Sequence, residues 1–340
     1  MNSFKGGYSG RILYIDLSSE SFEFRDTPEN TARDYIGGRG LATRLFVDNT
    51  PPGADPLGEK NSIVIASSPV TATSAPTSGR GHMVFKSPLT GAIGSSNSGG
   101  KWGARFKQAG CDAVVLLGRA RRAVIVFIDG TSGGPPAVSF IDASSLRGMD
   151  VHRTGDSLLS SPDMKGASGL FVGPAGENMV RFASVMNDYN RAYGRGGAGA
   201  VFGSKNLKGI VVRGSAKTSV ADRDKFKAGA GHARYKLKAV PGTKRILKEL
   251  GTAGLVNLID WIDMLPRRNF QTTGHDPADL DAICGEAIAD TILDKPSGCY
   301  LCPMMCGRRT TVDGKSGEGP EYESVVLLGP VLDIYDLKTI

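Results

Sequence analysis

The sequence predicts an α+β protein in which a β-rich N-terminal domain, residues 1–214, is followed by a mainly helical domain, residues 215–340. Three observations predict this class. Short apolar or alternating runs bounded by Gly, Pro, Ser and Thr recur before residue 215 and indicate strands. After residue 215, apolar residues recur three and four positions apart, as they do in helices. Strands that follow one another without an intervening helix argue against a doubly wound parallel sheet.

The N-terminal part contains eight predicted strands and three predicted helices. The strands are expected at residues 11–17, 62–68, 82–86, 113–118, 123–129, 169–173, 180–186 and 209–214. The helices are expected at residues 30–47, 101–109 and 149–161. Each strand is predicted from an alternating or short apolar run bounded by turn residues.

The C-terminal part contains two long stretches with helical spacing, at residues 222–240 and 243–265. The final segment, from residue 319 onward, becomes helix-like and stops without a Gly or Asn cap or a polar tail. We therefore expect the helical domain to be incomplete at its C-terminus.

The composition is that of a folded protein with a basic surface. Apolar residues make up 40% and charged residues 22% of the 340 residues, and the formal net charge is +7. This charge favours an anionic ligand, an anionic cofactor or an acidic partner protein. The Lys and Arg residues look scattered and only 7% of residues are aromatic, so we expect no nucleic-acid partner.

The sequence also indicates a cellular location. No apolar run approaches the ~20 residues of a membrane span, and the N-terminus lacks the apolar run of a signal peptide. Five cysteines, three of them crowded together, suit metal ligation in a reducing compartment better than a disulfide framework. We therefore expect a cytoplasmic protein without a membrane partner.

The densest chemistry is the stretch GCYLCPMMCGRR, residues 298–309, with Cys299, Cys302 and Cys306. This C-x2-C-x3-C spacing places three soft thiolate ligands on one tight turn. A [4Fe–4S] cluster, whose fourth cysteine commonly comes from elsewhere, fits the spacing. Two alternatives remain open: a zinc ion with a fourth ligand, and three small buried side chains without a ligand.

Two Gly-rich stretches suggest an anion site. They are SSNSGGKWG, residues 95–103, and NDYNRAYGRGGAGAVFGSKNLKG, residues 187–209. Backbone N–H groups exposed by Gly can surround phosphate oxygens, and Arg adds paired donors. The GRGGAG motif also permits a dinucleotide site, although its flanks are polar, and plain turns are a third interpretation.

Five segments together resemble the tungsten-containing aldehyde:ferredoxin oxidoreductases. In order along the chain they are SPVTATSAPTSGR (68–80), KSPLTGAIGSSNSGGKWGARFKQAGCDAVVLLG (86–118), GPAGENMVRFASVMNDYNRAYGRGGAGAVFGSKNLKGIVV (173–212), CYLCPMMCG (299–307) and EGPEYES (318–324). Five motifs in the same order make the resemblance specific, and it spans essentially the whole chain.

The resemblance implies a platform of two β-sheets that carries tungsten, or molybdenum, on two pyranopterins whose phosphates share a Mg²⁺ ion. It implies a neighbouring [4Fe–4S] cluster bound by Cys299, Cys302 and Cys306. The residues that match the family's pterin-binding positions are Arg80, Asn97, Gly99, Arg191, Ala192 and Gly194. The carbonyls of Asn97 and Ala192 are the expected Mg²⁺ ligands, which suits a hard cation. The fourth cluster cysteine and a further active-site histidine are expected beyond residue 340.

The resemblance also implies a reaction and a base. Small aldehydes would be oxidised to carboxylic acids, with electrons leaving through the cluster to ferredoxin or a similar acidic carrier. Glu323 would accept a proton beside the metal, a role that improves when burial raises a carboxyl pKa toward neutrality. From the sequence alone, a solvated acidic turn at a helix start is the preferred explanation of Glu318, Glu321 and Glu323, and the resemblance reverses that preference. Relatives that reduce aromatic-ring thioesters, a non-catalytic electron-transfer fragment and a homo-oligomeric assembly also remain open.

Overall fold

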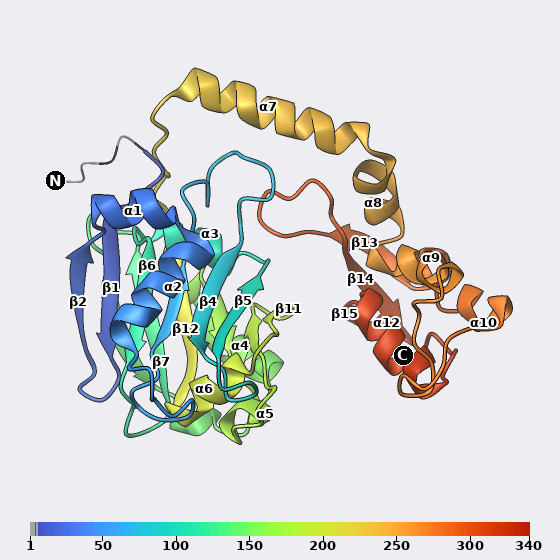
Figure 1. Cartoon of the computed structure of the whole chain (residues 1–340), viewed down its shortest axis with the longest axis horizontal. Coiled ribbons are helices and arrows are strands. Elements are labelled where there is room, and N and C mark those ends of the chain that lie inside the picture. Colours follow the sequence, from blue (N-terminus) through green and yellow to red (C-terminus); the bar gives the residue numbers. More distant parts are fainter. Residues whose placement is uncertain (1–3, 5) are drawn as a thin grey trace. The chain divides into compact units, whose positions relative to one another are not determined.

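The computed structural model describes residue 4 and residues 6–340. The chain forms two compact units, Met1–Phe226 and Lys227–Ile340, which we describe separately (Figure 1). The boundary predicted after Gly214 lies at the end of strand β12 (Leu207–Gly214), and the division between the units falls within helix α7 (Arg223–Ala239).

Two six-stranded sheets form the frame of the first unit, as predicted from the resemblance. One sheet has the order β2-β1-β6-β3-β4-β5 and the other the order β11-β10-β9-β12-β7-β8. The strands besides β12 are β1 (Arg11–Asp16), β2 (Ser21–Asp26), β3 (Ile63–Ala66), β4 (Gly81–Lys86), β5 (Ile93–Ser98), β6 (Ala113–Leu117), β7 (Val124–Gly130), β8 (Ala137–Asp142), β9 (Ser168–Phe171), β10 (Val185–Asn187) and β11 (Arg191–Tyr193).

Strand direction confirms that this is not a doubly wound parallel sheet. Only β1 with β6 and β7 with β12 pair in parallel; the other neighbours in both sheets are antiparallel. Antiparallel neighbours need only short connections, which explains why few helices interrupt this part of the sequence.

The core lies between the two sheets. In β1, Leu13 and Ile15 enter a buried cluster shared with β7 and β12, whereas Ile12 and Tyr14 face the opposite side and pack on α2 (Gly38–Asn49). In the sheet that contains β7, β9 and β12, the face away from this core packs on residues of α4 (Val151–Leu159). The two-residue alternation of strand side chains thus builds four layers, with a helix outside each sheet.

The first unit has more helices than predicted, and the long one is broken. Its other helices are α1 (Glu29–Tyr35), α3 (Trp102–Gln108), η1 (Ser144–Leu146), η2 (Pro162–Met164), α5 (Pro174–Glu177) and α6 (Ala198–Ser204). The predicted helix 30–47 is interrupted at Ile36, which has a left-handed φ of 61°, and at Gly37, which is extended. The predicted strand 180–186 is wrong in its first part, since residues 180–184 are irregular apart from a turn at 181–182 and β10 begins only at Val185.

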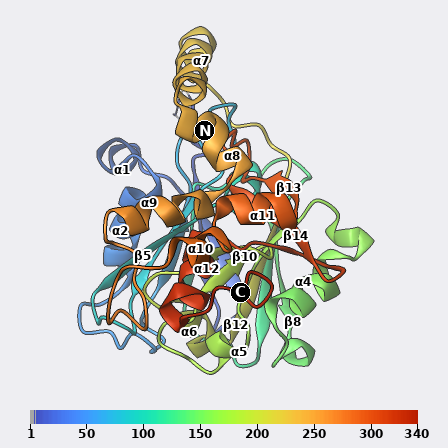
Figure 2. The same cartoon turned by 90° about the vertical axis from the view of Figure 1, so that its right-hand side faces the viewer.

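The second unit is mainly helical, as predicted, and also carries a small sheet that the sequence did not indicate. Its helices after α7 are η3 (Gly242–Ile246), α8 (Leu247–Glu249), η4 (Thr252–Leu255), α9 (Val256–Trp261), α10 (Pro277–Asp281), α11 (Gly285–Thr291), α12 (Tyr322–Leu328) and η5 (Pro330–Leu332). The antiparallel strands β13 (Leu293–Ser297), β14 (Gly307–Val312) and β15 (Lys315–Glu318) follow α11, which packs beside β13 (Figure 2).

Among residues 4 and 6–340, no helix combines the length and the apolar character that crossing a bilayer requires.

Candidate functional site

In the first unit, the two Gly-rich segments lie side by side at the edges of the two sheets. β5 is the last strand of one sheet, β11 is the last strand of the other, and the two strands contact each other (Figure 1). The Arg195 N–H donates to Ser96 Oγ at 3.2 Å, and Ser87 Oγ donates to the Gly196 carbonyl at 2.7 Å. Segments almost a hundred residues apart in sequence therefore form one continuous surface.

On the β5 side, the predicted pair Arg80 and Asn97 is in direct contact. The Arg80 guanidinium donates to Asn97 Oδ1. Asn97 lies opposite His82 in the β4–β5 pair. Burial lowers the pKa of His82, and the positive charges of Arg39 and Arg80 lower it further. Two exposed guanidinium groups beside a largely neutral imidazole give this edge a positive potential that would attract an anion.

Gly99, also predicted to touch the cofactor, is fixed by a side chain from the other sheet. Asn187 is fully buried in β10, and its Nδ2 donates to the Gly99 carbonyl at 2.6 Å and to Ser98 Oγ at 3.3 Å. Gly100 has a φ of +80°, and a Cβ there would approach Asn187 Oδ1 to 2.9 Å, so only glycine suits this turn. Asn187 also lies opposite Arg191 in the β10–β11 pair. This amide therefore supports both predicted segments.

Tyr193 makes a second connection between the two sheets. A Cβ at Gly81, the residue after Arg80, would lie closer than 3.0 Å to the Tyr193 hydroxyl. Tyr193 follows Ala192 directly and is completely buried. The absence of a side chain at Gly81 thus allows β4 and β11 to approach each other behind the predicted cofactor residues.

The remaining predicted residues lie on β11 and just beyond it. Arg191 and Ala192 are half-buried, and Gly194 is exposed with open space where a Cβ would stand. Asn97 and Ala192 belong to the two edge strands, and an edge strand has backbone carbonyls that are not paired within its sheet. Such carbonyls suit the predicted Mg²⁺.

The surface formed by β5 and β11 fits an anionic, phosphate-bearing cofactor. Four buried polar atoms on β5, β11 and the strands beside them have no hydrogen-bond partner in the described chain: His82 Nδ1, Ser95 Oγ, Asn187 Oδ1 and the Tyr193 hydroxyl. Buried polar groups nearly always have a hydrogen-bond partner. Where the chain itself supplies none, a bound ligand or an ordered water molecule can supply it. Sequence reasoning missed Asn187 and Tyr193 as supporting residues, although both lie inside the segment quoted for the resemblance.

In the second unit, the three clustered cysteines lie on the loop that joins β13 to β14. Cys299, Cys302 and Cys306 are half-buried, and the Cys302 N–H donates to the Cys299 carbonyl at 3.1 Å. Leu301 and Met305 both have a left-handed φ of 46°, so the loop turns sharply between the cysteines. These turns keep all three thiols on one short segment.

A buried arginine anchors this loop. Arg308 is only 1% exposed, and its guanidinium donates to the carbonyls of Leu247, Lys248, Glu249 and Met305 at 2.8–3.0 Å. Burial lowers the pKa of Arg308, whereas the electrostatic interaction with the Cys306 side chain raises it. A cation beside Cys306 would stabilise thiolate and a negatively charged cluster.

The three thiols are soft donors of the kind that an iron–sulfur cluster or a zinc ion binds, the two metal groups considered from the spacing. In the described part of the chain, no three His, Cys, Asp or Glu side chains are grouped so that they could hold a single metal ion. The other two cysteines, Cys111 and Cys284, are buried, and burial raises the pKa of the Cys111 thiol to about 12.

Glu323 lies in the first turn of α12 and is exposed within its own unit. Val325 and Val326 form the buried face of this helix. Glu318, by contrast, accepts a hydrogen bond from Ser297 Oγ at 2.8 Å within the three-stranded sheet. Within the second unit, the Glu323 side chain is therefore accessible to solvent or to a ligand.

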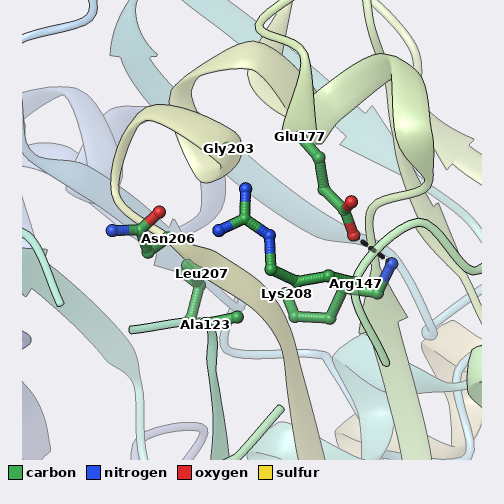
Figure 3. A pocket seen from close by; sticks show the side chains of 7 residues that line it. All are labelled: Ala123, Arg147, Glu177, Gly203, Asn206, Leu207 and Lys208. Atoms are coloured by element: carbon green, nitrogen blue, oxygen red, sulfur yellow. Dashed lines mark hydrogen bonds and ion pairs between the residues drawn. The ribbon is translucent and has the colours of Figure 1, made fainter. Parts of the chain in front are cut away.

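A separate pocket in the first unit contains none of the predicted residues. It is lined by Ala123, Arg147, Glu177, Gly203, Asn206, Leu207 and Lys208 (Figure 3). The buried Lys208 ammonium pairs with Glu177 at 2.5 Å and donates to the Met149 carbonyl at 2.8 Å. These contacts fasten the loop after η1 to β12, so we assign the pair a structural role.

Models of one protein family match both halves of the chain. A family model for the N-terminal domain of aldehyde ferredoxin oxidoreductase matches residues 12–214, and one for domains 2 and 3 matches residues 230–340. The tungsten-containing aldehyde ferredoxin oxidoreductase of Pyrococcus furiosus is 42% identical over 98% of this chain, and that of Thermococcus kodakarensis is 41% identical. A WOR-like subunit of an aliphatic sulfonate oxidoreductase from Pyrococcus furiosus is 29% identical over a similar span.

A solved structure shares the fold. The BamBC active-site complex of benzoyl coenzyme A reductase, with bound 1,5-dienoyl-CoA, superposes with a TM-score of 0.87 at 26% identity and covers 98% of this chain and 51% of its own. The chain spans about half the length of its relatives, 54% for the Pyrococcus furiosus enzyme. The matches to both family models and the 42% identity show that this chain belongs to the aldehyde ferredoxin oxidoreductase family, a family of oxidoreductases.

Proposed function

We propose that the chain is the cofactor-binding part of a tungsten- or molybdenum-dependent enzyme that oxidises small aldehydes to carboxylic acids. Electrons would leave through a [4Fe–4S] cluster to ferredoxin or a similar acidic carrier. The observation that carries the proposal is the convergence of Asn97 and Arg191, on different sheets, at one surface with unsatisfied buried polar atoms. The identity of 41–42% to relatives named for this activity supports it.

Six residues would hold a bis-pyranopterin, and three would hold the cluster. Arg80 and Arg191 can each offer two parallel N–H donors to a phosphate group. The Asn97 and Ala192 carbonyls would bind Mg²⁺, and Gly99 and Gly194 leave room for close backbone approach. Cys299, Cys302 and Cys306 would each bind an iron atom. When bound, the metal–pterin group supplies the two-electron redox chemistry and the cluster supplies the one-electron path outward.

The chain's own chemical task is proton transfer. Oxidation of one aldehyde with one water to a carboxylic acid releases two protons and two electrons. The Glu323 carboxylate would accept a proton from the attacking water, and solvent would then remove it. The reducing cytoplasm is the compartment that we propose, because it keeps the cluster thiols available.

A second candidate is the reduction of an aromatic ring carried as a coenzyme A thioester. The TM-score of 0.87 to the benzoyl coenzyme A reductase complex favours this candidate. Its 26% identity is well below the 42% of the aldehyde-oxidising relative, so we rank aldehyde oxidation first.

Substrate profiling separates the two candidates. We expect the anaerobically isolated protein to reduce benzyl viologen with aldehydes and to leave benzoyl coenzyme A unchanged when supplied with reduced dye. Ring reduction without aldehyde oxidation would select the second candidate.

The role of Glu323 is tested in the same dye assay. Glu323→Gln should lower kcat by about 10²-fold or more, the scale of general base catalysis. Glu286→Gln, in the equivalent first turn of α11, is the matched control and should have no effect. Equal activity of the two variants would remove Glu323 from the mechanism.

A further inference from the structure

Nearly all of the net charge of the chain comes from one short segment. Residues 227–249 contain seven Lys and Arg residues and one Glu, a formal charge of +6, compared with +7 for all 340 residues. We call residues 227–249 the basic segment; it comprises most of α7, all of η3 and all of α8. Seven of the 41 Lys and Arg residues thus gather in 23 positions with a single acidic residue, although residues 227–340 as a whole contain 14 Lys and Arg and 15 Asp and Glu.

The basic segment presents its charge to solvent. Within the described chain, Arg245 forms an ion pair with Glu249 at 2.9 Å, and none of the five lysines forms a salt bridge. Those five, all exposed, are Lys227, Lys236, Lys238, Lys244 and Lys248. Ala230 is the single buried residue of α7. Unpaired exposed cations of one sign produce a positive potential that steers and holds acidic partners.

Apolar side chains stand exposed among these cations. Tyr235 is 70% exposed, Val240 52% and Ile246 42%. Protein interfaces commonly combine a few large apolar side chains with charged side chains around them. The apolar side chains add affinity, and the charged ones orient the partner.

The C-terminal end of the basic segment adjoins the cysteine loop. Arg308 connects the two, because its guanidinium donates both to the α8 carbonyls of Leu247, Lys248 and Glu249 and to the Met305 carbonyl. Gly251, just after α8, would place a Cβ 3.2 Å from the Cys306 carbonyl. α8 therefore packs directly against the loop that carries the three cysteines, next to the β13–β14 pair (Figure 1).

We propose that the basic segment is the docking surface for a small acidic electron-carrier protein, and this inference rests on the proposed function. The contact between α8 and the cysteine loop distinguishes such a partner from a nucleic acid, because only an electron carrier gains from docking beside the cluster. Each docking event would pass one electron, so two carriers are reduced for each aldehyde oxidised.

The test measures binding, not turnover. The dissociation constant of the anaerobically isolated protein for an oxidised, acidic [4Fe–4S] ferredoxin is measured at about 50 and about 300 mM NaCl, where screening differs strongly. The variant Lys236→Glu/Lys244→Glu/Lys248→Glu reverses three charges of the basic segment. The control Lys60→Glu/Lys165→Glu/Lys217→Glu makes the same change in net charge at exposed lysines of the first unit.

We expect the first variant to weaken ferredoxin binding about tenfold or more at low salt, the control to change it less than about threefold, and the difference to shrink at high salt. Equal affinities of the two variants would overturn the proposal. So would a 20-base-pair DNA probe that binds the wild type more tightly than ferredoxin does and is lost in the first variant.

Two further readouts keep this inference separate from the proposed function. Both triple variants should retain wild-type metal content and wild-type aldehyde oxidation with benzyl viologen, which needs no docked protein. If these readouts stay normal while ferredoxin binding is unaffected, the docking surface is refuted and the proposed function stands.

Discussion

Gly81 gives the most direct test of how the two sheets are joined behind the candidate site. Gly81→Ala would place a methyl group closer than 3.0 Å to the Tyr193 hydroxyl, a separation that packed atoms do not tolerate. Both residues are buried, so neither can move aside into solvent. Overpacking of this kind costs about 1–3 kcal/mol of folding free energy. The backbone of Gly81 does not have a left-handed φ, so the loss would come from the contact alone.

A second substitution should rescue the first. Tyr193→Phe removes the hydroxyl oxygen, and the next atoms around the new Cβ are then Tyr193 Cζ and Gly103 Cα, both at an ordinary 3.7 Å. Because the hydroxyl has no partner in the described chain, Tyr193→Phe alone should be neutral or should stabilise the protein. We therefore expect the double variant to be within about 0.5 kcal/mol of Tyr193→Phe, a positive coupling in a double-mutant cycle.

Tryptophan fluorescence during urea unfolding measures the first unit selectively. Trp102 is fully buried in that unit, whereas Trp261 of the second unit is already 80% exposed in the folded chain. Gly173→Ala is the control, since a Cβ there meets no atom closer than 3.8 Å. The reasoning is refuted if Gly81→Ala and Gly81→Ala/Tyr193→Phe lose the same stability, or if Tyr193→Phe alone costs more than about 1 kcal/mol.

Three further predictions address the interior and the cysteine loop. Asp112 accepts from Lys107 Nζ at 2.5 Å with both side chains 1% exposed, and it also accepts from the Ser9 and Gly10 N–H groups and from Thr27 Oγ1. Asp112→Ala should therefore cost about 3–5 kcal/mol in urea unfolding, and Lys107→Met/Asp112→Ala should cost clearly less than the sum of the two single variants; additive losses would argue against a buried ion pair. Burial lowers the pKa of Lys205 to about 8, so the unfolded chain holds this proton at higher pH than the folded chain. Stability should rise between about pH 8 and about pH 10.4 by at most about 1.4 kcal/mol per pH unit, and an unchanged slope in Lys205→Met would contradict this assignment. Cys302→Ser should lower the iron content and the visible iron–sulfur absorbance, whereas Cys284→Ser should keep both; normal iron in Cys302→Ser would exclude that thiol as a ligand.

The strands that sequence patterns predicted are those with buried apolar faces. RILYIDL was identified because Leu13 and Ile15 face one cluster and Ile12 and Tyr14 another. β2 was missed because it is an edge strand in which five of six residues are exposed. Its position depends on antiparallel pairing with β1, which begins at Asp16 and Ser21 across the turn 17–20.

Other omissions have the same cause. β5, with the sequence IGSSNS, resembles a turn because it is polar, and only its register against β4 makes it a strand. β13 contains a proline, which removes a backbone donor and argues against a strand in any single-sequence reading. Conversely, residues 180–184 alternate like a strand yet leave Phe182 72% exposed, because no neighbouring strand pairs with them.

The candidate site likewise contains residues that the sequence could identify and residues that only the fold reveals. The residues that carry charge, thiol or Gly signals, such as Arg80 and Cys299, could be named from motifs. Asn187 and Tyr193 could not, because their importance comes from contacts across the two sheets, with Gly99 and Gly81. The basic segment could have been counted in the sequence, but its contact with the cysteine loop through Arg308 required the fold.

Elemental analysis of the anaerobically isolated, full-length protein tests the central claim most directly. The proposed function predicts tungsten or molybdenum together with about four iron atoms per polypeptide, the content of one metal–pterin site and one [4Fe–4S] cluster. Iron without tungsten or molybdenum would contradict it.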